Sequence, residues 1–245
     1  MKNFEIKNVD CHATLAMTKN AQNGRSMIEM LGVLAIIGVL SVGGIAGYSK
    51  AMTKYRINKA IEQITLIAGN VRTFFASQGN YVGVRCSSND MTGQCDSGGC
   101  VGHNNGCPIL KKAKILPDEM ITVNAAGRIT SITNPFGYGI GLSTANKAKS
   151  GDNQAFVLDY NIDGKNLEVC LELASHDWSV AGAKYIWVYD GGPMKGGKIT
   201  VPGDMDKAFD VCSKAYSNGE RKIHIRFYFD VNSNCWDETN GNTCS

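Results

Sequence analysis

One long apolar run limits what this chain can fold into more than any other feature. From Met30 to Tyr48 there is no charged side chain. A helix rises about 1.5 Å per residue, so the run would be roughly 28 Å long, close to the hydrocarbon thickness of a bilayer. A buried helix and the core of a cleaved signal are the alternatives. The length and continuity of the run favour a helix that spans a membrane.

The residues at the edges and along one side of the run carry further information. Glu29 lies at its N-terminal edge, and Gly24 precedes this carboxylate by five residues. Gly43 and Gly47 form a small-xxx-small pair, which would let another helix approach closely. The alternative is that the glycines of the run only loosen the helix, because each costs about 1 kcal/mol relative to alanine. These glycines are Gly32, Gly38, Gly43, Gly44 and Gly47.

Beyond Ser49 the apolar residues recur at steps of three and four, as on one face of an amphipathic helix. The stripe consists of Ile57, Ile61, Ile64, Ile67, Ala68, Val71, Phe74 and Phe75. No proline interrupts residues 27–78, and Gly79–Asn80 is a suitable stop. We therefore expect one helix of about 50 residues, roughly 75 Å long, whose second half packs its stripe on the rest of the chain.

Eight of the nine cysteines follow the apolar run, which indicates an oxidising compartment and up to four disulfides. They are Cys86, Cys95, Cys100, Cys107, Cys170, Cys212, Cys235 and Cys244. Eight cysteines can pair in on the order of a hundred ways, so the sequence leaves the connectivity open. The pairs that we consider first are Cys86–Cys107 around Cys95–Cys100, then Cys170–Cys212 and Cys235–Cys244.

The rest of the chain predicts a head built mainly from antiparallel strands. Strands are expected at 129–133, 155–162, 184–189 and 223–229, turns at 135–139 and 163–164, and short helices at 167–174 and 208–216. The strand at 223–229 alternates isoleucine and phenylalanine with polar residues. The predicted fold class is α+β: a long N-terminal helix packed on a mainly antiparallel sheet, with disulfide-rich loops.

Two stretches could be drawn as metal sites, and for both a structural interpretation is preferred. Cys95, Cys100, His103 and Cys107 match no common zinc spacing, and disulfides are favoured. Residues 159–164 match the first half of a calcium loop, but Cys170 stands where the closing glutamate belongs, so a hairpin turn is favoured. Weak calcium candidates remain near the C-terminus, namely Asp230, Asn232 and Asn234.

The sequence contains no nucleophile elbow, P-loop, zinc-protease motif or dinucleotide fingerprint, so we expect neither enzymatic activity nor a cofactor. The formal charge of +3 is too small to indicate nucleic-acid binding.

The segment Gly24-Arg25-Ser26-Met27-Ile28-Glu29, followed by the long apolar helix, resembles the prepilin cleavage and methylation signature of type IV pilins and related pseudopilins. Glycine, spacing, glutamate and apolar run all agree with it. The resemblance covers residues 24 to about 55. Beyond them the chain is similar to pilins in outline only: helix, variable loop, sheet and a C-terminal segment bounded by cysteines.

The resemblance implies a leader at 1–24, a helix at 25–79 and a disulfide-rich head at 80–245. In the family an inner-membrane prepilin peptidase cuts after the glycine and methylates the new N-terminus, here between Gly24 and Arg25. Glu29 then becomes the fifth residue of the mature chain and pairs with the N-terminus of a neighbouring subunit. Gly38 falls where the family often has glycine.

Three positions differ from the commonest family pattern. Arg25 stands where the family usually has phenylalanine, methionine or leucine, and Ala46 takes the place of a helix-breaking proline. The 24-residue leader is longer than in type IVa pilins and is similar to that of the type IVb branch.

The function that the resemblance implies is that of a structural subunit in a type IV pilus-like, homo-oligomeric filament. The precursor would lie in the inner membrane, and the mature chain in an extracellular pilus or a periplasmic filament. A minor pilin or pseudopilin of a secretion or DNA-uptake system is one alternative. A membrane-tethered extracytoplasmic binding module or enzyme, using the helix only as an anchor, is another.

Overall fold

The computed structural model describes residues 27–84, 86–87, 107–125, 127, 129–145, 154–189, 196–217 and 222–230. The chain divides into two units, Met1–Tyr48 and Ser49–Ser245. Helix α1, Met27–Phe75, has 49 residues and contributes to both. The prediction of one long, unbroken helix is therefore confirmed. The boundary of the compact unit at Ser49 places the second half of α1 within the head rather than before it.

The predicted stripe on the second half of α1 is buried. Of the predicted residues, those that are buried are Ile57, Ile64, Ile67, Ala68, Val71 and Phe75, whereas Ile61 is half-buried. Ala60, which the prediction did not include, is buried as well. Phe74, one residue from the end, is 39% exposed, so Phe75 is the aromatic residue that faces the core. Turns follow α1 up to Gly79, whose positive φ of 66° favours glycine, and the helical segment ends near the predicted stop.

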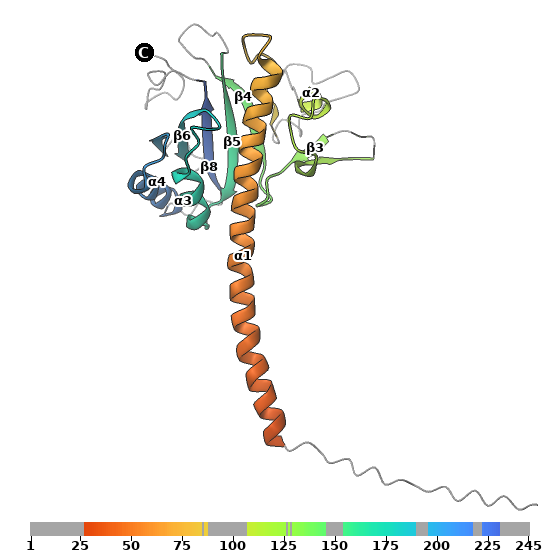
Figure 1. The fold of residues 1–245 in the computed structure, drawn as a ribbon, viewed down its shortest axis with the longest axis vertical. Coiled ribbons are helices and arrows are strands. Elements are labelled where there is room, and N and C mark those ends of the chain that lie inside the picture. The colour runs from red at the N-terminus through yellow and green to blue at the C-terminus, as the bar shows by residue number, and fades with distance from the viewer. Residues whose placement is uncertain are drawn as a thin grey trace, which may run out of the picture. The chain divides into compact units, whose positions relative to one another are not determined.

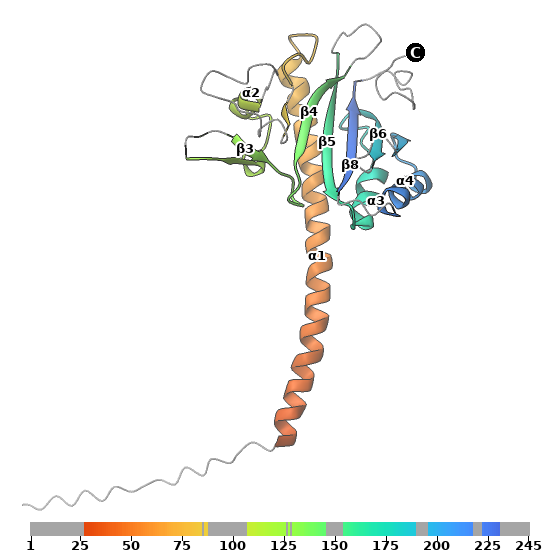
Figure 2. The same ribbon diagram turned by 180° about the vertical axis from the view of Figure 1, so that it is seen from behind.

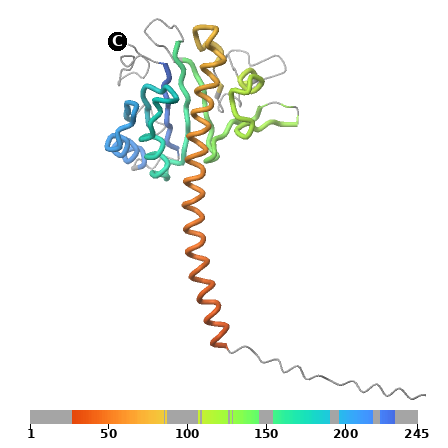
Figure 3. The backbone as a smooth tube through the Cα atoms, viewed as in Figure 1, coloured from red at the N-terminus to blue at the C-terminus, as the bar shows by residue number. Residues whose placement is uncertain are grey.

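The head is built on a six-stranded sheet with the strand order β1-β4-β5-β8-β6-β7, and every neighbouring pair is antiparallel. The strands are β1 (Cys86–Ser87), β4 (Ile140–Ala145), β5 (Ala155–Asp163), β6 (Ala183–Tyr189), β7 (Gly196–Thr200) and β8 (Lys222–Phe229). After β5 the chain passes through β6 and β7 before β8 returns between β5 and β6 (Figure 3).

The smaller elements flank this sheet. They are helices α2 (Cys107–Lys112), α3 (Leu167–Ser175) and α4 (Met205–Ser217), the 3-10 helix η1 (Asp118–Met120), and a two-stranded sheet of β2 (Ile121–Val123) and β3 (Ile129–Ile132). Helix α2 and β3 lie on the side of β4, whereas α3 and α4 lie on the side of β6 and β8 (Figure 1). From behind, β4, β5 and β8 lie in front of the second half of α1 (Figure 2).

The main core lies between one face of the sheet and the helices. Strand β8 shows how the sequence directs apolar side chains to this face. Every second residue, namely Ile223, Ile225, Phe227 and Phe229, points to the same side of the sheet, and all four are fully buried in this core. Residues of α1, α3 and α4 complete the same cluster. The α+β fold class predicted from the sequence is confirmed.

Two of the disulfides considered from the sequence are present. Cys86–Cys107 joins β1 to α2, with Cα atoms 4.8 Å apart, and Cys170–Cys212 joins α3 to α4, with Cα atoms 5.9 Å apart. The other four downstream cysteines, Cys95, Cys100, Cys235 and Cys244, lie outside the described residues.

The turn after β5 differs from the expectation of a hairpin. Residues 164 and 165 form a turn, in which the Lys165 amide donates to the Asp163 carboxylate at 2.9 Å. The chain then enters α3, whose N-cap is Asn166, because the Asn166 side chain accepts from the amide of Val169. The predicted strand, the turn and the predicted short helix after it are thus confirmed, and the turn leads into α3 rather than joining two hairpin strands.

Candidate functional site: the long helix and its attachment to the head

The first half of α1 presents an apolar surface on all sides. Every side chain from Met27 to Lys50 is exposed. Thirteen of these are large hydrophobic residues: Met27, Ile28, Met30, Leu31, Val33, Leu34, Ile36, Ile37, Val39, Leu40, Val42, Ile45 and Tyr48. Among the described residues, α1 is the one helix long and apolar enough to cross a membrane. Its surface therefore matches an apolar environment, such as lipid or other apolar helices.

Glu29 is the one acidic residue of this apolar half. It lies in the first turn of α1 with its side chain exposed, and no ion pair joins it to another described residue. A carboxylate in the first turn is favoured by the partial positive charge at a helix N-terminus. Gly24 and Arg25 lie outside the described residues, so the predicted cleavage and pairing stay predictions.

The glycines on this half have no packing role within the chain. A Cβ built at Gly38, Gly43 or Gly47 would meet no atom within 4 Å. Each glycine still weakens the helix by about 1 kcal/mol relative to alanine. Gly43 and Gly47 are four residues apart and share one face of α1, where a second helix could approach closely.

Charged side chains attach the second half of α1 to neighbouring elements of the head. Lys54 forms ion pairs with Glu168 and Glu172 of α3. Lys59 forms one with Glu119 of η1 at 3.1 Å, and this hydrogen bond lowers the pKa of the Glu119 carboxyl. These pairs are partly exposed, so most of the attachment energy comes from the buried apolar stripe.

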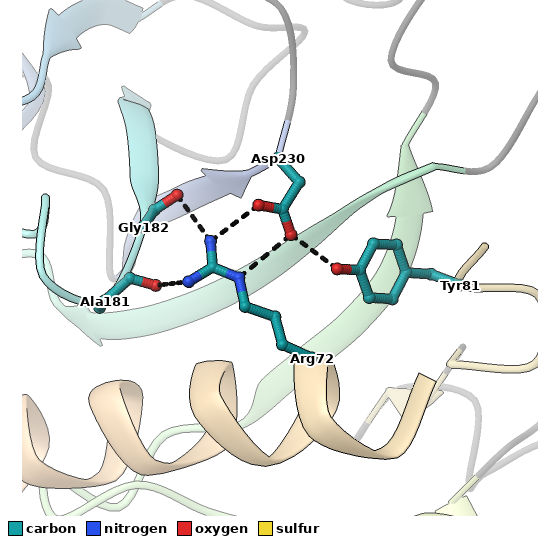
Figure 4. A network of polar contacts seen from close by, with 5 residues as sticks. All are labelled: Arg72, Tyr81, Ala181, Gly182 and Asp230. Carbon is teal, nitrogen blue, oxygen red and sulfur yellow. Dashed lines mark hydrogen bonds and ion pairs between the residues drawn. The ribbon is translucent and has the colours of Figure 1, made fainter. Parts of the chain in front are cut away.

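A more buried polar cluster, centred on Arg72, joins the end of α1 to two strands (Figure 4). Arg72 donates to the carbonyl oxygens of Ala181 and Gly182 at 2.6 and 2.8 Å, just before β6. It also donates to both carboxylate oxygens of Asp230, at 2.9 and 3.1 Å, just after β8. Bidentate, charge-assisted contacts of this kind are among the stronger hydrogen bonds in proteins. We call Arg72, Tyr81, Ala181, Gly182 and Asp230 the Arg72 cluster.

Two further features show that the Arg72 cluster depends on particular residues. The Tyr81 hydroxyl donates to the Asp230 carboxylate at 2.6 Å, and burial together with this hydrogen bond raises the pKa of Tyr81 above its ordinary value. Gly182 has a positive φ of 76°, and a Cβ there would overlap the Arg72 guanidinium. Only glycine therefore allows the guanidinium to reach both carbonyl oxygens.

The Arg72 cluster argues against Asp230 as a calcium ligand. Both of its carboxylate oxygens already accept hydrogen bonds from a guanidinium. A calcium ion at this carboxylate would have to displace that cation or lie beside it. The other two candidates, Asn232 and Asn234, lie outside the described residues.

The half-loop at 159–164 holds no calcium site either, as far as its described side chains show. Asp159, the first position of the motif, is in strand β5 and accepts from Arg226 of β8 at 2.6 and 3.2 Å. Of the possible zinc ligands, Cys107 is in a disulfide, while Cys95, Cys100 and His103 lie outside the described residues.

Sequence reasoning missed the Arg72 cluster. Arg72 falls between the apolar residues of the predicted stripe, where the sequence alone indicates an exposed polar side chain. It is the basic residue in the last turn of α1, which was the available signal. Its partners are more than a hundred residues away in the sequence, and no local pattern connects them.

Comparisons with known proteins give one structural similarity to report. No family model matches the chain, and no curated protein matches it. Among solved structures, it is similar to a type IVb pilin from Salmonella typhi, with 14% identity and a TM-score of 0.40, over 71% of this chain and 99% of that chain. Because both values are low, we base no functional conclusion on this match.

The described residues form the α+β architecture that the sequence predicts. A long N-terminal helix with an apolar first half packs its second half on an antiparallel sheet, and disulfides join the flanking elements.

Proposed function

We propose that this chain is a structural subunit of a type IV pilus-like filament. It is made as an inner-membrane precursor, is cut by a prepilin peptidase between Gly24 and Arg25, and assembles with further copies through the first half of α1. Its role is structural rather than catalytic. The mature chain resides in an extracellular pilus or periplasmic filament.

The observation that carries this proposal is the division of α1 into two environments. One unbroken helix has an apolar, fully exposed first half and a second half that is part of the core of the head. Exposed apolar surface of this extent is unfavourable in water, so lipid or other subunits must cover it. A helix that served only as a membrane tether would not need to continue into the core.

Glu29 supports assembly rather than simple anchoring. An acidic residue inside a bilayer or an apolar helix bundle costs about 3 kcal/mol or more unless it is paired. Cleavage after Gly24 would create a positively charged N-terminus four residues away, and the Arg25 side chain adds a second positive charge. In a neighbouring copy these groups would neutralise Glu29 and fix the axial offset between subunits.

Paired variants test the two stages separately. In a host with the pilus machinery, Gly24→Ala is expected to leave the precursor uncut, which a gel shift detects. Glu29→Gln is expected to be cut but to be absent from the sheared filament fraction.

Glu62→Gln is the matched control, because Glu62 is an exposed carboxylate on the second half of the same helix. It is expected to be cut and assembled normally. Assembly of Glu29→Gln at the level of the unmodified chain would exclude the pairing role and favour a chain that is only tethered.

A further inference from the structure

Two helices of the head lie at opposite edges of the six-stranded sheet. Helix α4 packs on the edge strand β7, where a Cβ at Gly197 would overlap Val211 of α4. Helix α2 is joined to the other edge strand, β1, by the disulfide Cys86–Cys107. Both ribbon views place the two helices on opposite sides of the head (Figure 1, Figure 2). The edge strands are about 24 Å apart, at about 4.8 Å per strand, so α2 and α4 of one head do not cover each other.

Helix α4 has an exposed apolar stripe. Met205, Phe209 and Tyr216 are four and seven residues apart, which places them on one face of the helix. All three side chains are exposed, and that of Phe209 is 56% exposed. Asp206 and Asp210 each follow a residue of the stripe and form an exposed acidic row beside it. We call these five residues the α4 surface.

Helix α2 has an exposed apolar side chain among lysines. Ile109 is 56% exposed. Lys111 and Lys112 are in the last turn of α2, and Lys114 comes two residues after the helix. Lys114 lies 3.9 Å from Asp118, which offsets part of this positive charge. We call Ile109, Lys111, Lys112 and Lys114 the α2 surface.

We propose, on the basis of the filament role above, that the α4 surface of one copy packs on the α2 surface of the next copy, so that neighbouring heads contact each other. Burial of the exposed apolar side chains on both surfaces would drive the contact. The aspartates of α4 would then lie opposite the lysines of α2. Opposite charges of this kind favour one orientation and one partner surface over others.

Contacts between two like surfaces are disfavoured. Two α4 surfaces would bring the acidic rows of both copies together, and Lys214, which pairs with Asp210, offsets only one of the two carboxylates. Two α2 surfaces would bring the lysines of both copies together. A contact between different surfaces at opposite edges can also repeat from copy to copy, as a filament requires, whereas a symmetric dimer ends after two copies.

Each of the two helices is fixed by a disulfide. Cys107, the first residue of α2, is bonded to Cys86 of β1, and Cys212 of α4 is bonded to Cys170 of α3. All four cysteines are buried. A surface that is already rigid loses less conformational freedom on binding, so these bonds favour a contact through α2 and α4.

Removal of the apolar stripe is the first test, on the full chain in a host with the pilus machinery. Met205→Ser/Phe209→Ser is expected to be cut behind Gly24 as the unmodified chain is, but to fall about tenfold or more in the sheared filament fraction. Val180→Ser is the matched control, because Val180 is exposed in the turn before β6 and belongs to neither surface. This control is expected to assemble normally.

Charge exchange tests the identity of the partner surface. Asp206→Lys/Asp210→Lys and Lys111→Glu/Lys112→Glu are each expected to lower the filament fraction about tenfold. A chain that carries all four substitutions again has opposite charges on its two surfaces, and it is expected to recover to within about threefold of the unmodified level. Such a recovery would not follow from misfolding, because each pair of substitutions would still harm its own helix.

The outcomes separate the contact between heads from the filament role itself. Normal amounts of filament from the stripe variant, or from both charge variants, would overturn the inference and leave the proposed function intact. Failure of the chain with four substitutions to recover would overturn it too, because the losses would then be separate effects on each surface. An unmodified chain that is neither cut nor present in filaments would overturn the proposed function, and the contact between heads with it.

Discussion

At the scale of single residues, Asp230 has the clearest structural role. Its carboxylate accepts three hydrogen bonds, two from Arg72 and one from Tyr81, and its backbone ends β8. The cluster joins parts of the chain that lie 158 residues apart. A side chain of the same shape without the charge would keep the volume but lose the charge-assisted contacts.

We therefore expect Asp230→Asn to lower the free energy of unfolding by about 1–3 kcal/mol, because it leaves a half-buried guanidinium without its anionic partner. Urea unfolding of the full chain in micelles measures the change. Asp210→Asn is the matched control, since Asp210 pairs with Lys214 on the exposed side of α4. If both variants unfold alike, Asp230 has no special role in stability.

A substitution at Tyr160 is expected to stabilise the fold, whereas Asp230→Asn is expected to destabilise it. The Tyr160 side chain is fully buried, its hydroxyl finds no hydrogen-bond partner among the described residues, and burial raises the pKa of the phenol well above the ordinary value. Removing an unsatisfied buried hydroxyl removes its desolvation cost, so Tyr160→Phe should raise the free energy of unfolding by about 1 kcal/mol.

Tyr81→Phe serves as the comparison for Tyr160→Phe, since its hydroxyl does have a partner in Asp230. That variant should lower stability by about 1 kcal/mol. A shift in the same direction for both tyrosine variants would contradict the assignment of the two hydroxyls.

At the scale of elements, α1 is attached to η1 by an ion pair whose strength depends on pH. The hydrogen bond from Lys59 lowers the pKa of Glu119 in the folded state. A lowered folded-state pKa stabilises the fold above the ordinary glutamate pKa of about 4.3, and this contribution is lost as the pH falls through the folded-state value.

We expect the unmodified chain to lose more stability between neutral pH and pH values of about 3 than Glu119→Gln does. The difference should be small, because the Glu119 side chain is 53% exposed. Urea unfolding at a series of pH values measures it. Identical pH profiles would show that this pair does not contribute to the attachment of α1.

The elements also show which parts of the fold could be predicted from the sequence. Helix α1 and strands β5 and β8 have long, clear apolar periods, and they form where the period indicates. Strand β7 was missed because its Gly196 and Gly197 weaken any strand pattern. The structure gives the reason for these glycines: a Cβ at Gly197 would overlap Val211 of α4, and one at Gly196 would overlap the backbone of β6.

Some residues of the candidate site could likewise be predicted from the sequence, and others could not. Glu29 and the glycines of the apolar half are visible in the sequence because their neighbours in the chain make them unusual. The Arg72 cluster depends on contacts between α1, the turn before β6 and the end of β8, so only the folded chain brings it together. The disulfide pairs Cys86–Cys107 and Cys170–Cys212 were among many that the spacing allowed, and the fold selects them.

At the scale of the whole molecule, one helix takes part in two kinds of packing. The second half of α1 is committed to the core of its own head through a buried stripe, ion pairs and the Arg72 cluster. The first half is left with an apolar surface that needs a membrane or other copies of the chain. Force applied to a subunit through α1 would thus reach the sheet through both apolar packing and the Arg72 cluster.

The central claim is that α1 becomes a filament helix after cleavage behind Gly24. Mass spectrometry of the N-terminal peptide, from filaments sheared off intact cells, tests it most directly. We expect a filament protein whose first residue is Arg25, with Glu29 in fifth place. A chain that is missing from the filaments and still begins near Met1 in the membrane fraction would contradict it.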